Sequence, residues 1–178
     1  MKDSQFSTIA PAWLGVFAFR FFLLPLRAPN VDPLLATLMP LGKRTSAFTS
    51  IAFAATSIIA YDAVTAGLGS WTLAAAGAYG LVALLASLYF SFAPATRAHF
   101  VGFGIAATLL YDALTGLTVG PIIFHQSFAV ALTGQIPFTI MHLAGTILFA
   151  LALSPLLDRA LARAAYATVA ENVSPIAA

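Results

Sequence analysis

The chain has 178 residues, of which 61% are hydrophobic and 8% are charged, and its formal net charge at pH 7 is +2. Soluble domains carry about 25% charged residues, so this much apolar surface has to face lipid. The chain lacks the basic face that nucleic-acid binding needs, and the absence of cysteine excludes disulfides and thiolate metal sites. These features predict an integral membrane protein with a single transmembrane domain over residues 1–178.

The apolar stretches predict helices, because a helix of about 20 residues crosses the hydrocarbon core and satisfies its own backbone there. The first helix is expected from Pro11 to Leu26, and Asn30 to Leu41 is expected to return as a short second helix. Further helices are expected at Ser46 to Ala63, Trp71 to Phe92, Ala98 to Leu114 and Ile136 to Leu157. Residues 160–178 then form a short cytoplasmic tail.

Basic residues predict which helix ends face the cytoplasm, because short cytoplasmic loops are enriched in lysine and arginine. The markers are Lys43 with Arg44, Arg97, and Arg159 with Arg163. An even number of crossings has to separate successive markers, so Val119 to Gly134 is interpreted as an outside loop or a re-entrant segment. The resulting fold class is all-α: an integral membrane bundle of six transmembrane helices with both termini cytoplasmic, multi-pass in the cell membrane.

Three of the six acidic residues lie on the opposite, outer side in this topology. Asp32, Asp62 and Asp112 are each placed at or near an outer helix end. Arg27 joins them as an exception to the charge rule; either it pairs with a carboxylate or a ligand, or it is solvated at the interface. The outer half of the bundle is therefore where we expect a ligand to bind.

An internal repeat supports this topology. Residues 59–66 and 109–116 match at a separation of fifty positions, and each copy contains a Tyr-Asp pair, Tyr61-Asp62 and Tyr111-Asp112. Parallel repeats are common in transporters, whose substrates bind where the repeats meet. Alternatively, each tyrosine is an interfacial anchor and each aspartate a polar helix stop. Both interpretations place the two pairs at the ends of outward-running helices.

Catalytic motifs are absent from the sequence, which contains no HExxH, no GxSxG and no P-loop. We therefore expect no enzymatic activity, no catalytic residues, no metal site and no cofactor. Arg20 lies within the first helix, and His142 lies about two turns into the last one. His142 either contacts a ligand or makes an interhelical hydrogen bond. Gln135-Ile136-Pro137 is expected to open the last helix, whose positive end favours an anionic group.

Several of these features occur together in a known family. Asn30-Val31-Asp32-Pro33 precedes a short second helix, Tyr-Asp pairs end two helices, and a long fifth loop follows. The last helix reads Gln135-Ile136-Pro137-Phe138 to His142-Leu143-Ala144-Gly145. Over residues 12–159 the chain resembles the substrate-capture (S) components of energy-coupling factor (ECF) transporters.

The resemblance implies a subunit that binds a vitamin or related micronutrient from outside, energised through a separate transmembrane scaffold by two ATPase subunits. It also implies a substrate site built from the first, third and fifth loops and the outer half of the last helix. The site residues it implies are Arg27, Asn30, Asp32, Tyr61, Asp62, Trp71, Tyr111, Asp112, His125, Gln126 and His142. The family's scaffold-docking face departs from its usual spacing here, because Ala12, Gly15 and Ala18 are spaced by three.

Two other functions are compatible with the same helices. One is a structural or assembly membrane protein of similar six-helix shape, such as a rod-shape morphogenesis protein, which transports no ligand. The other is an intramembrane enzyme, which would need hydrogen-bond contact between two or more members of one set: Arg20, Asp62, Asp112, His125 and His142. A ligand-sized outer pocket lined by aromatic and polar side chains distinguishes a capture subunit from a structural protein.

Overall fold

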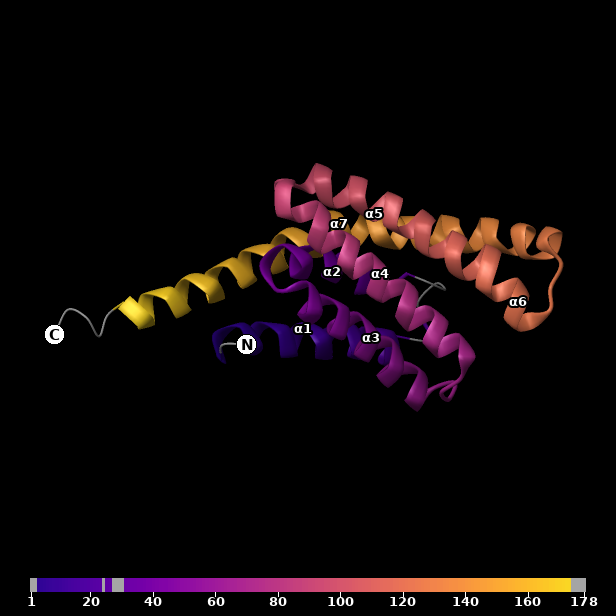
Figure 1. Cartoon of the computed structure of the whole chain (residues 1–178), viewed down its shortest axis with the longest axis horizontal. Coiled ribbons are helices and arrows are strands. Elements are labelled where there is room, and N and C mark those ends of the chain that lie inside the picture. The colour runs from indigo at the N-terminus through magenta and orange to yellow at the C-terminus, as the bar shows by residue number, and fades with distance from the viewer. Residues whose placement is uncertain (1–2, 24, 27–30, 174–178) are drawn as a thin grey trace.

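The structure, a computed structural model, describes residues 3–23, 25–26 and 31–173, and these residues form helices and connecting turns without strands. Figure 1 shows the arrangement. The elements are α1 (Asp3–Phe22), α2 (Leu34–Arg44), α3 (Ala47–Val64), α4 (Ser70–Phe92), α5 (Arg97–Asp112), η1 (Ala113–Val119), α6 (Gly120–Phe124) and α7 (Phe128–Val173). Because α5, η1 and α6 follow one another without a break, the described chain contains six helical stretches.

Four of these stretches are long and apolar enough to cross a membrane. They are Ala47–Val64, Ser70–Phe92, Arg97–Phe124 and Phe128–Ala167, while the apolar part of α1, Phe6–Phe22, is shorter. Large apolar side chains point outward from them, as at Leu73, which is 73% exposed, and Leu148, which is 58% exposed. The expectation of a helical membrane protein is confirmed to this extent. The count of six crossings and the side on which the termini lie stay predictions.

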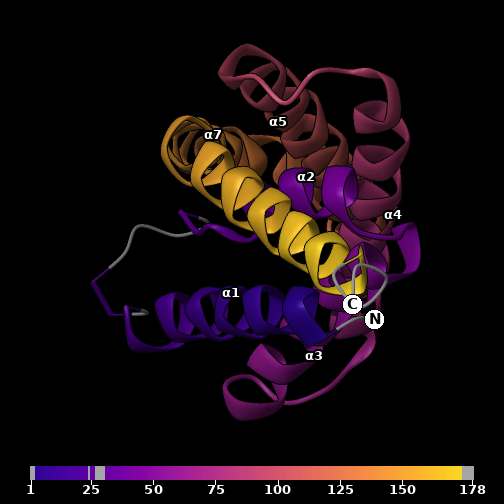
Figure 2. The ribbon, with the colours of Figure 1, turned by 90° about the vertical axis from the view of Figure 1, so that its left-hand side faces the viewer.

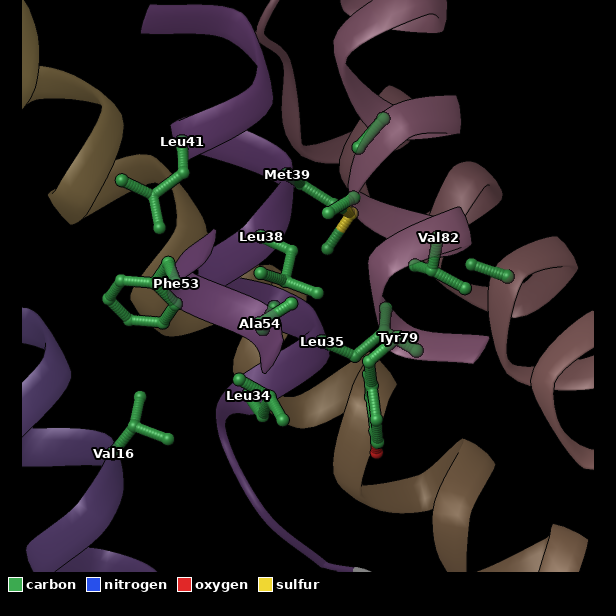
Figure 3. Packing of buried hydrophobic residues seen from close by; sticks show 14 of the residues in the cluster. Val16, Leu34, Leu35, Leu38, Met39, Leu41, Phe53, Ala54, Tyr79 and Val82 are labelled. Atoms are coloured by element: carbon green, nitrogen blue, oxygen red, sulfur yellow. The ribbon is translucent and has the colours of Figure 1, made fainter. Parts of the chain in front are cut away.

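The short helix α2 lies in the interior of the bundle. Every residue from Leu34 to Gly42 is buried, and α2 packs against α3, α4, α5 and α7. A helix with apolar residues on all sides is suited to such a position. Figure 3 shows Leu38 and Met39 within this core, with Tyr79 of α4 at its edge and the tyrosine hydroxyl pointing away from both. This residue therefore carries a polar group from the apolar core toward the beginning of α2.

Side chains of neighbouring helices satisfy carbonyls that prolines leave unbonded. Pro40 lies inside α2 and has no N–H to offer the Ala36 carbonyl four residues earlier, and the Ser154 hydroxyl donates to that carbonyl over 2.7 Å. In the same way, Pro155 of α7 leaves the Leu151 carbonyl without its helical donor. This carbonyl accepts a hydrogen bond from Nε of Arg97, at the start of α5. These prolines thus create interhelical hydrogen bonds.

The predicted grouping of basic residues agrees with the fold. The Lys43 ammonium donates to the carbonyls of Phe90 and Ala93 at the end of α4, over 2.9 and 3.0 Å. Arg44 makes a bidentate ion pair with Asp158 of α7, at 2.6 and 2.9 Å. Figure 1 places the α2–α3 and α4–α5 connections at one end of the bundle, and Figure 2 shows the start of α1 and the end of α7 toward the same side. The α3–α4 connection and α6 lie at the opposite end.

The prediction of a loop or re-entrant segment over residues 119–134 was wrong. The helical stretch continues through a π-helix to Phe124, and only residues 125–127 separate it from α7. Gly120 permits the wide π turn, because a Cβ there would lie 2.8 Å from the Thr115 carbonyl oxygen. His125 ends α6 in the left-handed conformation, with φ of 52°.

The last helix consequently begins earlier than predicted. It starts at Phe128, so Gln135 and Pro137 lie inside it rather than at its amino end. The suggestion that Gln135 to Pro137 present a helix N-terminus to an anionic group was therefore wrong. The helix start was placed there because the apolar stretch begins at Ile136 and an even number of crossings was required, but proline is tolerated inside bundle helices where other groups satisfy the freed carbonyl.

Candidate functional site

A set of polar and aromatic side chains lies in the interior where α1, α3, α4, α5 and α7 meet the beginning of α2. We call this set the polar cluster. Its members are Arg20, Asp32, Tyr61, Tyr79, Tyr111, Asp112, Gln135, Thr139 and His142. It consists of an arginine-carboxylate group, a carboxylate-histidine group and a pair of tyrosines between them.

The arginine-carboxylate group joins α1, α2 and α3. Arg20 and Asp32 expose only 11% and 9% of their side chains, and Arg20 Nε lies 3.7 Å from Asp32 Oδ2. The guanidinium carbon lies 4.4 Å from the centroid of the Tyr61 ring, in cation–π geometry. Asp32 is held by its Oδ1, which accepts from the Leu34 backbone N–H over 2.9 Å. With these contacts, Arg20 Nε and Nη1 are buried and have no hydrogen-bond partner within the part of the chain that the structure describes.

The carboxylate-histidine group joins α5 and α7. Asp112 Oδ1 lies 2.8 Å from His142 Nδ1, and Asp112 Oδ2 accepts from the Thr139 hydroxyl over 2.6 Å. Gln135 Nε2 in turn donates to the Thr139 hydroxyl oxygen over 3.1 Å. Residues 135, 139 and 142 are spaced by four and three, so they lie on one face of α7. Both oxygens of the aspartate are occupied, and the group is a fully formed hydrogen-bond chain.

Two tyrosines connect these groups. The rings of Tyr79 and Tyr111 lie with their centroids 4.2 Å apart, and Tyr111 also meets the His142 ring edge-on at 5.6 Å. Both tyrosines also lie near Arg20, which contacts the ring of Tyr61. The polar cluster is therefore continuous across the bundle, and it combines flat aromatic surfaces with hydrogen-bonding groups.

A cavity of about 700 Å³ lies next to this cluster, between the α3–α4 connection and α6. Tyr61, Asp62, Trp71 and Phe124 are among its lining residues, and the Trp71 and Phe124 rings lie 5.7 Å apart. Tyr61 belongs both to the cavity wall and to the polar cluster. The volume is in the range of small-molecule sites, which extends from about 300 to 1,000 Å³.

The predicted site residues are divided between several places. Arg27 and Asn30 lie outside the described residues. The other residues fall into three groups: Asp32, Tyr61, Tyr111, Asp112 and His142 in the polar cluster; Tyr61, Asp62 and Trp71 at the cavity; and His125 and Gln126 exposed in the turn between α6 and α7.

The two Tyr-Asp pairs are not equivalent. Asp62 is half-buried near the end of α3, as the repeat predicts, but Asp112 is 2% exposed and is followed by further helix. The second pair does end the α-helix α5, but a π-helix and α6 continue the helical stretch beyond it to Phe124. Tyr111 is consequently an interior residue that packs on Tyr79, and an interfacial-anchor role does not fit its 6% exposure.

Four members of the polar cluster are not among the predicted site residues: Arg20, Tyr79, Gln135 and Thr139. Tyr79 lies in a long apolar helix and carries no local signal, so only its packing on Tyr111 reveals it. Thr139 was detectable, because it is four residues after Gln135 and three before His142. Arg20 was noticed as an unusual charge, but its contact with Tyr61 depends on the packing of α1 against α3.

The described residues contain no group of three or more histidine, cysteine or acidic side chains that could hold a metal ion. Comparison of the chain with known protein families, with curated proteins and with solved structures finds no match. The polar cluster and the adjoining cavity both contain flat aromatic surfaces and hydrogen-bonding groups, which are features common to small-molecule sites.

Proposed function

We propose that this protein is the substrate-capture membrane subunit of an ECF-type importer of a vitamin or related micronutrient. It has no catalytic activity of its own, and a transmembrane scaffold with two ATPase subunits supplies the energy. Six membrane crossings, cytoplasmic termini and a location in the cell membrane are part of the proposal. The observation that carries it is the buried Arg20, whose Nε and Nη1 have no hydrogen-bond partner among the described residues.

Buried hydrogen-bond donors of a charged side chain are costly inside a membrane protein when they have no acceptor. A buried ionised group without its full set of hydrogen bonds destabilises the fold by about 1–3 kcal/mol or more. Ionisable residues inside membrane helices accordingly mark binding sites or transport pathways. A ligand that accepts hydrogen bonds from Arg20 would offset this cost, whereas a purely structural bundle gains nothing from leaving these donors without partners.

The surroundings of Arg20 also suit capture of an aromatic micronutrient. Tyr61, Tyr79 and Tyr111 offer ring surfaces, and Trp71 lines the cavity that shares Tyr61. Aromatic side chains bind flat ligands with large contact areas and little loss of conformational entropy. In the proposed topology the α3–α4 connection faces outward, so the cavity would admit ligand from outside the cell.

Native mass spectrometry of the protein purified alone in mild detergent tests the proposal. We expect a bound small molecule of vitamin size, retained through purification or taken up again from a panel of vitamins. Trp71→Ala should weaken binding at least about tenfold, which corresponds to 1.4 kcal/mol. Leu73→Ala is the matched control, because Leu73 lies two residues away and is 73% exposed.

The opposite result is equally informative. A spectrum that stays free of ligand after incubation with the panel would contradict capture and would favour the structural or assembly protein. Equal ligand binding by Trp71→Ala and Leu73→Ala would show that the cavity beside α6 takes no part in binding.

A further inference from the structure

Arg20 and Asp32 place hydrogen-bond donors beside an acceptor for which the described residues provide no partner. Among these residues, Arg20 Nε and Nη1 have no hydrogen-bond partner. Asp32 Oδ1 is already used by the Leu34 N–H, but no donor among the described residues reaches Asp32 Oδ2 within hydrogen-bond distance. That oxygen lies 3.7 Å from Arg20 Nε, which is too long for a hydrogen bond. The two free positions are therefore adjacent.

Charge in the polar cluster opposes a negatively charged ligand. Arg20 is the only permanent cation among the described members of the cluster, and Asp32 already neutralises it at close range. Asp112 adds a second carboxylate, paired with His142. An anionic ligand would compete with Asp32 for Arg20 and would bring a second negative charge beside a buried carboxylate, which is unfavourable. A neutral ligand avoids this cost.

The tyrosines indicate the shape of the ligand. Tyr61 faces the guanidinium at 4.4 Å, and the Tyr79 and Tyr111 rings lie near enough to Arg20 to interact with it electrostatically. Flat rings of this kind favour a planar ligand that stacks or packs edge-on. The ligand therefore has to place its hydrogen-bonding groups in the plane of an aromatic or conjugated ring.

From these observations we infer that the captured ligand is a neutral planar heterocycle with a lactam or ureide edge, whose C=O accepts from Arg20 and whose neighbouring N–H donates to Asp32 Oδ2. This inference rests on the proposed capture function and specifies its substrate class. It assigns Arg20 and Asp32 as the residues that distinguish such rings from carboxylates. The ligand C=O and N–H would each satisfy one group that the described residues leave without a partner.

Isothermal titration calorimetry in mild detergent tests the inference with three bicyclic probes. Lumazine, a pteridine-2,4-dione, has the lactam edge; 1,3-dimethyllumazine keeps the ring and the carbonyls but lacks both N–H groups. Quinoxaline-2-carboxylate has a similar size and an anionic group instead. We expect lumazine to bind at least about tenfold more tightly than either of the other probes, since one buried hydrogen bond is worth roughly 1.4 kcal/mol.

Protein variants locate the binding. Replacing only one member would leave a buried charge unpaired, so the test variant is Arg20→Met with Asp32→Leu, because apolar replacement of a whole buried pair is often tolerated. Its folding is checked by size-exclusion chromatography and melting temperature. Lumazine binding should fall at least about tenfold in this variant. Arg163→Met, which removes an exposed arginine, is the matched control and should bind as the wild type does.

The outcomes separate this inference from the proposed function. Equal affinity for lumazine and its dimethyl derivative would overturn the inferred contact of a lactam edge with Arg20 and Asp32. Unchanged lumazine binding in a folded double variant would do the same. Tighter binding of quinoxaline-2-carboxylate would overturn the neutral class. If none of the probes binds but the protein carries a co-purified molecule, the inferred ligand class is overturned and the capture function is not. Failure of all probes, together with no ligand in the mass spectrum, would overturn the capture function as well.

Discussion

The hydrogen bond between Ser154 and Ala36 provides a direct test of how α2 is held in the bundle. The Ser154 hydroxyl and the Ala36 carbonyl are fully buried and 2.7 Å apart. In an ordinary helix the N–H of residue 40 would donate to the Ala36 carbonyl, but Pro40 has none. Ser154→Ala therefore leaves this carbonyl without a donor, and we expect the free energy of unfolding to fall by about 2 kcal/mol.

A double-mutant cycle isolates the role of the proline. In a Pro40→Ala background residue 40 regains an N–H that donates to the Ala36 carbonyl, so Ser154→Ala should cost less than about 1 kcal/mol there. The measurement is reversible unfolding in mixed micelles of a mild detergent and dodecyl sulfate. Ser91→Ala is the control, because Ser91 makes an exposed bond of the same length to a carbonyl of its own helix. Equal costs of Ser154→Ala in both backgrounds would refute the reasoning.

Three further predictions concern packing, charge and topology. Gly42→Ala should destabilise the bundle by at least about 2 kcal/mol in the same unfolding assay, because the new Cβ would lie 2.7 Å from a backbone nitrogen of α4. In the control, Gly77→Ala, the new Cβ meets no atom within 4 Å, so this variant should not be destabilised. Asp112→Ala should lower the free energy of unfolding by about 3 kcal/mol, since it leaves the buried His142 without its carboxylate partner. An unchanged free energy of unfolding would show that the Asp112–His142 pair is not formed. In this cysteine-free chain, a cysteine at Gln126 should react with an impermeant reagent from outside and one at Thr96 only after lysis, and the reverse order would invert the proposed topology.

The class of the protein and most helix positions could be predicted from composition and hydropathy. A long apolar run with few charges forms a helix in the hydrocarbon core, because the helix satisfies its backbone hydrogen bonds within the segment. The predicted helix from Trp71 to Phe92 differs from α4 by one residue, and Ser46 to Ala63 differs from α3 by one residue at each end. These helices carry clear polar boundaries, such as Ser46, whose side chain caps the first turn of α3.

The prediction failed where a boundary signal was ambiguous. Pro137 was interpreted as a helix start and the polar residues His125 and Gln126 as the middle of a loop. In the structure the two polar residues occupy a turn of three residues, and Pro137 lies inside α7. A proline inside a helix and a proline at its start have the same local sequence pattern. Only packing against neighbouring helices decides between them.

For the candidate site, the sequence alone determined that a few ionisable and aromatic residues are embedded in an apolar chain, because charge is rare enough there for each exception to be conspicuous. Asp32, Asp112 and His142 were found in this way. The partners of these residues were decided only by the tertiary structure. Arg20 meets Asp32 and Tyr61 because α1, α2 and α3 converge, and Tyr79 joins them from an otherwise featureless helix. Hydropathy is a property of each residue, whereas a binding site is a property of distances between helices.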